Sequence, residues 1–190
     1  MQAVAQNIRW TVRDLELLPE NEGIRYEIIE GELFMARAPH SRHQQTCGKI
    51  FAQLDCWSEE TGLGEAILSP GVLFSDADNV IPDVVWVARE TYDRIVDDRG
   101  HLTGAPELAI EVLSTGERDR RRDMEVKLKL YSMRGVIEYW IVDWRARRVE
   151  VYCRENGQLR LARTLLGEDR ITSTLLPDFC CPIARFFPNF

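Results

Sequence analysis

Two apolar segments constrain the fold of this 190-residue chain more than any other feature of its sequence. Residues 80–88 and 107–113 are dominated by aliphatic and β-branched side chains, with little alternation between polar and apolar positions. Runs of this kind are typical of strands in a sheet that is covered on both faces. The two segments therefore predict a central sheet with other elements packed against each side.

The rest of the chain supplies elements that could cover such a sheet. Hydrophobic spacing predicts helices at residues 11–18, 41–60 and 118–134 and a helical turn at 90–96. Glu30-Gly31 predicts an N-terminal hairpin of residues 24–29 and 32–37, and further strands are expected at 65–74, 137–143, 148–154 and 158–164. Residues 75–79 resemble a turn, and the tail from residue 171 to 190 shows no clear pattern. This order predicts an α/β sandwich with one mixed sheet. Because we find no repeat or linker, we expect residues 1–190 to form a single domain.

The charge of the chain argues at first against a nucleic-acid binder, because 31 acids face 24 bases and the net charge is −7. The acids are concentrated before residue 100, however, and the second half of the chain carries a small basic excess. That excess lies largely in the 118–134 helix and at Arg145, Arg147 and Arg148, either as a solvated face or as a local basic patch.

The location of the protein is also indicated by composition. We find no apolar run long enough to cross a bilayer and no secretory signal in residues 1–25. Five cysteines, an odd number, suit a reducing compartment better than a disulfide framework. We therefore expect a cytoplasmic protein without a membrane partner.

Two carboxylates stand where a charge is costly to bury. Asp83 follows Pro82 at the start of an apolar run, and Glu111 interrupts the run Leu108–Leu113. A carboxylate buried without a partner, a proton or a metal costs several kcal/mol, roughly 2–7 even for a neutral polar group. Asp83 could instead cap a turn, and Glu111 could form a buried ion pair with an arginine.

A helical wheel adds a cation to this pair. With 100° per residue, Lys127 falls between Leu130 and Tyr131 on the apolar arc of the 118–134 helix, whereas Lys129 falls on the opposite side. Asp123 lies on the same arc one turn earlier and could pair with Lys127. The alternative is that the long Lys127 stem reaches outward to the solvent.

Two carboxylates on neighbouring strands and an inward lysine suit metal-assisted hydrolysis. Carboxylate oxygens are ligands that Mg²⁺ prefers, and the ion lowers the pKa of a bound water and offsets phosphodiester charge. The lysine can orient or help deprotonate that water, or offset charge in the transition state. A zinc site at His40-x-x-His43 is disfavoured because no cysteine pair accompanies it, so capping and surface exposure are expected for these histidines.

Several segments together resemble the Uma family of restriction-endonuclease-like proteins, a branch of the PD-(D/E)XK nucleases. The resemblance covers residues 11–154 and rests on Tyr26-Glu27-Ile28-Ile29-Glu30-Gly31-Glu32-Leu33, His43-Gln44, Pro82-Asp83-Val84-Val85, Ile110-Glu111-Val112-Leu113-Ser114, Asp123-x-x-x-Lys127-x-x-x-Tyr131 and Gly135-Val136-x-Glu138-Tyr139-Trp140-Ile141-Val142-Asp143. It implies a restriction-endonuclease-like core with a central mixed sheet flanked by helices. One departure is clear, because Leu113 stands where the wider superfamily carries its lysine.

The resemblance also implies roles for the site residues. Asp83 and Glu111 would hold Mg²⁺, or Mn²⁺ as a substitute, with the backbone carbonyl of Val112 assisting, and Lys127 would replace the missing lysine. The accessory candidates are Glu27, His43, Ser114, Asp123 and Tyr131. Glu27 either faces the site or forms a salt bridge within the hairpin, and Ser114 either caps the following helix or touches a phosphate.

These observations predict a metal-dependent endonuclease that hydrolyses DNA phosphodiester bonds and acts as a homodimer. RNA and branched or damaged DNA remain open as substrates. The alternative is a catalytically silent protein that keeps the nuclease fold and uses it as a binding or interaction module.

Overall fold

The structure is a computed structural model, and it describes residues 8–19 and 23–188. Helices are α1 (Val12–Leu15), α2 (Ser41–Thr61), α3 (Arg89–Ile95), α4 (Glu117–Arg121) and α5 (Leu128–Arg134), with a π-helical turn at Arg122–Lys127 and a 3-10 turn at Ile183–Phe186. Strands are β1 (Ile24–Ile29), β2 (Glu32–Arg37), β3 (Gly64–Leu68), β4 (Val72–Ser75), β5 (Asp78–Val80), β6 (Val84–Ala88), β7 (Leu108–Val112), β8 (Glu138–Asp143), β9 (Arg148–Glu155), β10 (Gln158–Leu166), β11 (Arg170–Thr172) and β12 (Cys180–Pro182).

A six-stranded mixed sheet forms the centre of the molecule, in the order β10-β9-β8-β7-β6-β3. Strands β7 and β8 run parallel, and the other neighbouring strands of this sheet, all within the described residues, are antiparallel. Every residue of β7 and β8 is buried. The apolar run ending at residue 113 is thus a central strand covered on both faces, as predicted.

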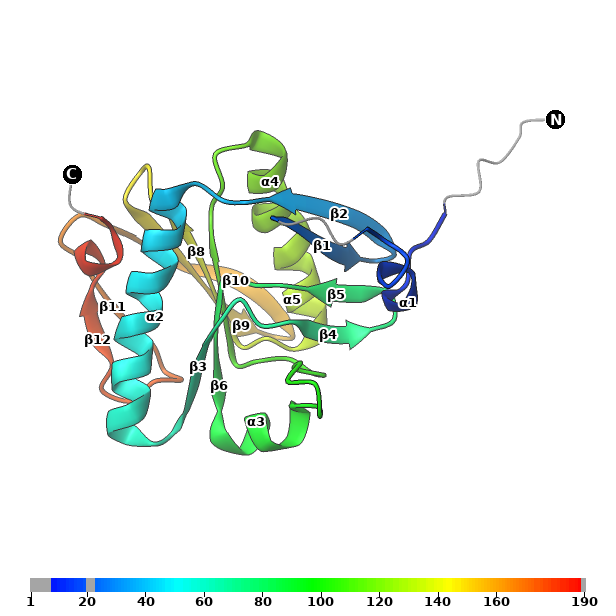
Figure 1. The fold of residues 1–190 in the computed structure, drawn as a ribbon. Helices are drawn as coiled ribbons and strands as arrows, with labels where there is room; N and C mark the ends of the chain where they lie inside the picture. Colours follow the sequence, from blue (N-terminus) through cyan, green and yellow to red (C-terminus); the bar gives the residue numbers. More distant parts are fainter. Residues whose placement is uncertain (1–7, 20–22, 189–190) are drawn as a thin grey trace.

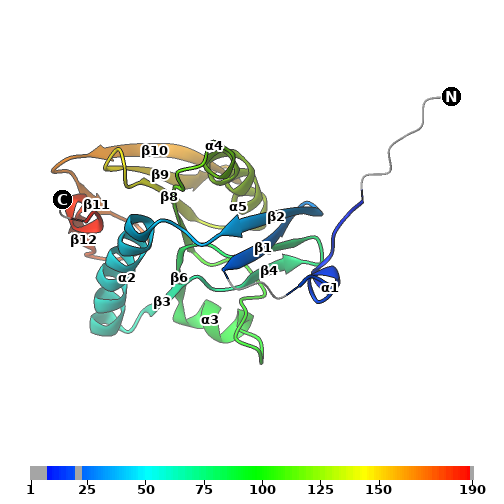
Figure 2. The ribbon, with the colours of Figure 1, turned by 45° about the horizontal axis from the view of Figure 1, so that its top comes forward.

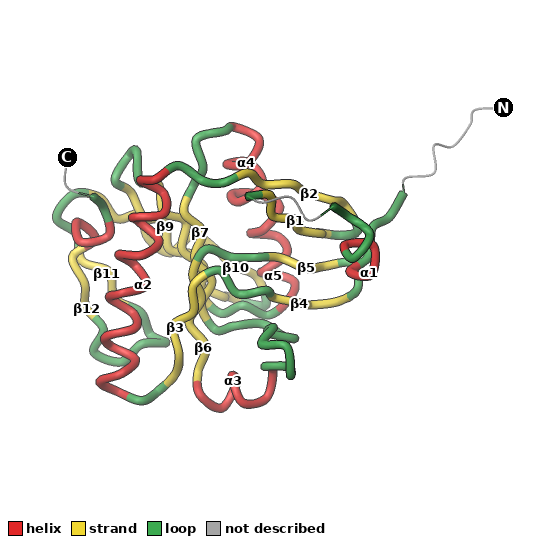
Figure 3. The backbone as a smooth tube through the Cα atoms, viewed as in Figure 1, coloured by secondary structure: helices red, strands yellow, loops and turns green. Residues whose placement is uncertain are grey.

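Each face of this sheet carries its own hydrophobic core, since successive strand residues point to opposite faces. Helix α2 covers one face, where Trp57, Trp86 and Trp140 are buried together. Helix α5 and a second sheet cover the other face, where Leu130 and Tyr139 pack. Figures 1 and 3 show α2 and α5 on opposite sides of the central strands.

The N-terminal hairpin belongs to this second sheet, which is antiparallel and has the order β2-β1-β5-β4. The sequence predicted the hairpin correctly but expected one mixed sheet and no second one. Figure 2 shows the small sheet lying beside α5 and the larger sheet. The separation arises because the chain leaves the central sheet after β3 and re-enters it at β6.

Two of the expected strands are therefore divided. The segment 65–74 splits into β3 and β4, because Ser69 adopts a left-handed backbone with φ of 48° and Pro70 lacks an N–H group. The segment 80–88 splits into β5 and β6 around Pro82. Of residues 75–79, expected as a turn, Asp76 and Ala77 form the tight connection between β4 and β5, whereas Ser75, Asp78 and Asn79 belong to these strands.

Helical predictions also need correction at two places. The helix expected at 11–18 is limited to Val12–Leu15, and a capping box of Thr11 and Asp14 begins it. The helix expected at 118–134 begins at Glu117 and contains a π-helical turn, at Arg122–Lys127, in its middle. No helix within the described residues combines the length and apolarity that a membrane crossing requires.

The C-terminal tail contributes to the core, which its sequence did not indicate. Strands β11 and β12 pair with each other, and the 3-10 turn that follows packs against α2. Ile171, Leu176, Ile183 and Phe186 are fully buried in the α2-side core. The last two residues of the predicted tail, 189 and 190, lie outside the described residues.

Candidate active site

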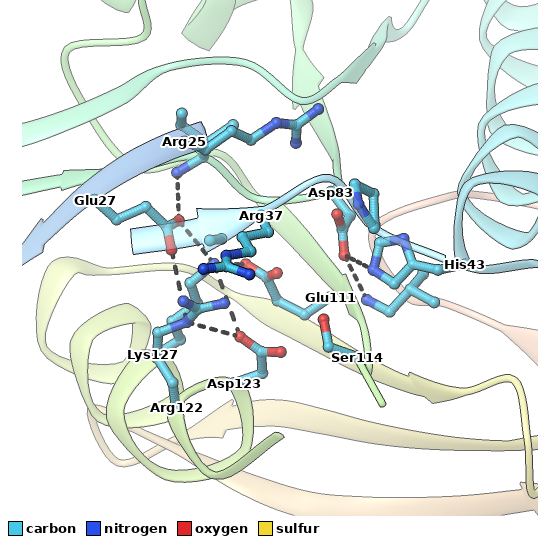
Figure 4. Close-up of a pocket in the computed structure, with 14 residues that line it drawn as sticks. Arg25, Glu27, Arg37, His43, Asp83, Glu111, Ser114, Arg122, Asp123 and Lys127 are labelled. Atoms are coloured by element: carbon cyan, nitrogen blue, oxygen red, sulfur yellow. Dashed lines mark hydrogen bonds and ion pairs between the residues drawn. The ribbon is translucent and has the colours of Figure 1, made fainter. Parts of the chain in front are cut away.

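A cavity of about 50 Å³ lies where the two sheets meet the π-helical turn (Figure 4). Its walls come from β1, the β2–α2 connection, the start of α2, the segment before β6, the end of β7 and the π-helical turn. The lining residues are Arg25, Glu27, Ala36, Arg37, Pro39, His43, Ile81, Asp83, Glu111, Val112, Ser114, Arg122, Asp123 and Lys127.

Sheet register brings Asp83 and Glu111 together. Strands β6 and β7 pair antiparallel with Val84 opposite Ile110, so Asp83 comes beside Glu111 at the end of β7. Asp83 Oδ2 accepts a hydrogen bond of 2.8 Å from the Val112 backbone N–H. Glu111 points to the α5-side face because Ala109 and Leu113, two residues away on either side, pack in that core.

His43 supports Asp83 from the first turns of α2. Its Nε2 lies 3.3 Å from Asp83 Oδ2, and its Nδ1 lies 3.5 Å from the Cys47 sulfur one turn later. Burial opposes ionisation of Asp83, but His43 and the Val112 N–H together hold the pKa of its carboxyl below the usual value. Burial likewise opposes a charge on His43, yet Asp83 raises the pKa of the imidazole above its usual value.

The expected exposure of His43 is wrong, because the side chain is buried against Asp83. His40 does cap α2, since its Nδ1 accepts a hydrogen bond from the Arg42 backbone N–H. Cys47 was not singled out by the sequence, although its Sγ, a nitrogen of His43 and an oxygen of Asp83 lie within 4.8 Å of one another. Burial raises the pKa of the Cys47 thiol, so that sulfur stays protonated in the described site.

Lys127 occupies the centre of the charged cluster. Its Nζ lies 2.8 Å from Glu111 Oε1 and 2.9 Å from Glu27 Oε1, and its side chain is 2% exposed. The inward direction predicted from the helical wheel is confirmed, as is the outward direction of Lys129, which is 61% exposed. Tyr131 Oη donates a further hydrogen bond of 2.9 Å to Glu111 Oε1. Burial disfavours a charged lysine, but Glu111 and Glu27 raise the pKa of Lys127, which therefore stays protonated.

Glu27 faces this cluster, where it pairs with Lys127 and Arg122. The alternative expectation, a salt bridge between Glu27 and another residue of the hairpin, is therefore wrong. Glu27 Oε1 also accepts a hydrogen bond of 2.8 Å from the Ile81 backbone N–H, where the chain passes from β5 to β6. Figure 4 shows Glu27, Lys127 and Asp123 on one side of the pocket and Asp83 with His43 on the other.

Arg122 is a buried charged residue of the site that the sequence did not identify. Its Nε lies 3.3 Å from Asp123 Oδ1 and 3.6 Å from Glu27 Oε2. Asp123 also approaches Lys127, at 4.0 Å. A regular α-helix would place Arg122 and Lys127 about 140° apart, whereas a π-helical turn with its i→i+5 bonds brings residues five apart onto one side.

The charges of the cavity do not balance among its buried side chains. Three carboxylates of the cavity are buried, namely Glu27, Glu111 and Asp123, against the two buried cations Arg122 and Lys127, which leaves an excess of one negative charge. The half-buried Asp83 adds a fourth carboxylate, whereas Arg25 and Arg37 line the cavity closer to the surface. Burial raises the pKa of Glu111 well above its usual value, and burial raises the pKa of Asp123 to about 6 despite Lys127 and Arg122. A cation bound beside Asp83 and Glu111 would offset this excess.

The donor atoms also fit a hard divalent cation. Each of the two adjacent carboxylates keeps one oxygen, Asp83 Oδ1 and Glu111 Oε2, to which none of the described residues donates a hydrogen bond. The cavity has room for an ion and water but not for a nucleotide. A larger substrate would therefore approach the carboxylates from the mouth, where Ser114 lies.

Comparison with known proteins agrees with this fold. The chain is similar to a solved structure described as a "putative nuclease belonging to DUF820" from Anabaena variabilis ATCC 29413, with a TM-score of 0.73 and 18% identity over 93% of this chain and 97% of that chain. No curated protein matches the chain. A model of the Uma2 family, described as "Putative restriction endonuclease", matches residues 12–184. The mixed sheet, the buried carboxylate–lysine cluster and this match together show that the chain belongs to the Uma2 family of restriction-endonuclease-like proteins.

Proposed function

We propose that the protein is a metal-dependent endonuclease that hydrolyses DNA phosphodiester bonds with Mg²⁺, or with Mn²⁺ as a substitute. One observation carries the proposal: Asp83 and Glu111 line one cavity whose buried side chains carry an excess of negative charge, and Lys127 Nζ lies 2.8 Å from Glu111 Oε1. Asp83, Glu111 and the carbonyl of Val112 would hold the ion. A bound divalent cation supplies Lewis-acid activation of water and offsets phosphodiester charge.

Within this proposal Lys127 acts as a cation and hydrogen-bond donor. A lysine whose pKa is raised keeps its proton, so it is suited to orienting a water or offsetting transition-state charge and not to removing a proton. Glu27, Asp123 and Tyr131 position Lys127 and Glu111, since each contacts one of them. His43 positions Asp83, and Ser114 stands at the mouth, where a phosphate would enter.

A cleavage assay with matched variants tests the proposal. Purified protein is incubated with plasmid, linear duplex, single-stranded DNA and RNA, in Mg²⁺, in Mn²⁺ and in EDTA. We expect cleavage only with metal, and a loss of about 100-fold or more for Asp83→Asn, Glu111→Gln and Lys127→Met. Lys129→Met, which removes an exposed lysine two residues away, serves as the control. Unchanged cleavage by both carboxylate variants would overturn the assignment.

The second candidate is a catalytically silent protein with the same fold, and one observation favours it. Lys127 and its partners already satisfy one another in a small cavity, as a purely structural network would. Calorimetric titration separates the two functions, because a structural network should bind neither Mg²⁺ nor Mn²⁺ specifically. Saturable binding that disappears in Asp83→Asn supports the nuclease.

A homodimer completes the proposal. Two sheet-edge strands leave apolar side chains exposed, namely Met35 on β2 and Leu161 and Leu166 on β10. Exposed apolar edges are suited to pairing with a second copy. Light scattering of the purified protein measures its mass in solution, and a monomer at micromolar concentration would exclude a stable dimer.

A further inference from the structure

Two further cavities continue outward from the candidate active site. A cavity of about 250 Å³ shares Ala36, Arg37, Pro39, His43 and Ser114 with the cavity of the candidate active site, so the two adjoin. A cavity of about 350 Å³ lies beyond it and is bordered by Arg42, Trp144, Arg145, Arg147 and Pro188. Trp144 borders both outer cavities, so the three cavities follow one another along the surface in a line that leads away from Asp83 and Glu111, and we refer to this line as the path.

Two aromatic rings are held in place along this path. The His40 and Trp144 rings stack with centroids 5.2 Å apart and planes 22° apart. Trp144 Nε1 donates a hydrogen bond of 3.1 Å to the Leu113 carbonyl, which fixes the indole to the end of the strand that carries Glu111. His40 is fixed by its capping bond at the start of α2. The stack is therefore a rigid platform attached to the same elements as the site.

The charge along the path is opposite to that of the whole chain. Arg37, Arg42, Arg145 and Arg147 line the two outer cavities, and Asp119 is the acidic residue among the described lining side chains. Asp119 Oδ1 lies 3.5 Å from Arg122 Nη1, so Arg122 neutralises part of the negative charge of Asp119. Arg147 also lies over the Phe187 ring, 5.1 Å from its centroid, which holds its guanidinium near the cavity.

The aromatic stack is partly open to solvent, because His40 is exposed and Trp144 is half-buried. Arginines beside such a platform form the chemistry that binds single-stranded nucleic acid, because phosphates pair with the cations while unpaired bases stack. A duplex offers its phosphates but hides the faces of its bases. We infer that this groove, lined by Arg37, His40, Arg42, Trp144, Arg145 and Arg147, binds a single-stranded segment that flanks the scissile phosphate, with one base stacked on Trp144. The position of that phosphate at Asp83 and Glu111 rests on the proposed function; the binding itself does not.

Fluorescence anisotropy in EDTA tests the inference without any cleavage. The probes are labelled oligothymidylate, the corresponding oligouridylate and a duplex of the same length. We expect both single strands to bind more tightly than the duplex, and the ratio of the first two separates DNA from RNA. Stacking of one base corresponds to roughly 5- to 150-fold in affinity, so Trp144→Leu should weaken single-strand binding by about fivefold or more.

Matched variants separate stacking and charge from a loss of folding. Trp144→Phe loses the same hydrogen bond to Leu113 as Trp144→Leu but keeps an aromatic face, so it should retain most of the affinity. Arg145→Ala should weaken binding severalfold, whereas Arg160→Ala removes an exposed arginine on β10, away from the groove, and should not.

The outcomes distinguish this inference from the proposed function. The groove assignment would be overturned, even in an active nuclease, by equal single-strand binding of the Trp144→Leu and Trp144→Phe variants. Equal effects of Arg145→Ala and Arg160→Ala, or tighter binding of the duplex than of the single strands, would overturn it as well. Groove-dependent binding by a protein that cleaves nothing in any metal would support the groove and refute the nuclease.

Discussion

Lys127 is the residue on which the electrostatics of the site depend. Its ammonium group lies between Glu27 and Glu111 and neutralises part of their charge in a region that is largely shielded from bulk solvent. Breaking a buried pair from one side leaves an uncompensated charge, which costs more than the pair itself contributes. The stability of the protein without metal should therefore be sensitive to this side chain.

We predict that Lys127→Met lowers the free energy of unfolding by about 3 kcal/mol at neutral pH, measured by urea denaturation. The matched variant Lys129→Met removes an exposed partner of Glu30 and should change stability by less than about 0.5 kcal/mol. The double variant Lys127→Met/Glu111→Gln should recover part of the loss, because it removes one of the unpaired carboxylates. Similar effects of the two lysine variants would show that Lys127 is not an electrostatic centre.

Most charged residues of the site could be identified from the sequence, but Arg122 could not. Asp83 and Glu111 could be identified because each is a charge at or within an apolar run, and Lys127 because helical periodicity places it inward. Arg122 falls on the polar side of a regular wheel, yet the structure buries it. The error lies in the assumed 100° per residue, which the π-helical turn does not follow.

At the scale of elements, the π-helical turn and the second sheet decide which groups meet. The π-helical turn directs Arg122 and Lys127 to the same carboxylate, Glu27 of β1. The second sheet is in turn tied to the end of α5 by Asp78, which accepts hydrogen bonds from the Glu30 backbone N–H at 2.7 Å, from Ser75 Oγ at 3.0 Å and from Arg134. Asp78 thus holds the strand that carries Glu27 against the helix that follows Lys127.

We predict that this tie makes the protein sensitive to acid. Burial opposes ionisation of Asp78, but the Glu30 N–H and Arg134 lower the pKa of its carboxyl below the usual 3.8. The folded state then binds fewer protons than the unfolded state, so the stabilisation is complete above about pH 4 and is lost as the pH falls through the folded pKa. Asp78→Asn should cost about 2 kcal/mol at pH 7, and this difference from the wild type should shrink below pH 4.

Urea denaturation across this pH range measures the effect. Asp76→Asn, in the same connection but with an exposed side chain, is the matched control and should behave like the wild type throughout. A difference between the wild type and Asp78→Asn that stays constant from pH 7 to pH 2 would contradict the lowered pKa.

On the scale of the whole molecule, the net charge of −7 limits how the protein can hold nucleic acid. The basic side chains of the proposed groove are four arginines against an acidic remainder. Counterion release on single strands gives a salt slope of about −0.7 for each phosphate neutralised, so four contacts correspond to roughly −3. The protein should therefore bind single-stranded nucleic acid with moderate affinity, and this affinity should depend only moderately on salt concentration.

We predict that the logarithm of the association constant for oligothymidylate falls with the logarithm of salt concentration with a slope no steeper than about −3. Arg145→Ala should reduce the magnitude of that slope by about 0.7, and Arg160→Ala should leave it unchanged. Anisotropy titrations at several salt concentrations give both slopes. A slope of about −6 or steeper would place the main contact on other basic surfaces of the chain.

The sequence alone determined the central strands, the two carboxylates at the start of one and within another, the inward lysine and the family to which the chain belongs. These features are local, because periodicity and the cost of a buried charge depend on neighbours along the chain. It could not determine which groups meet from distant segments. Glu27 and His43 reach the site from β1 and α2, and His40 stacks on Trp144 although the two residues are far apart in the sequence. Those contacts follow from strand register, from the division into two sheets and from the π-helical turn, which only tertiary packing decides.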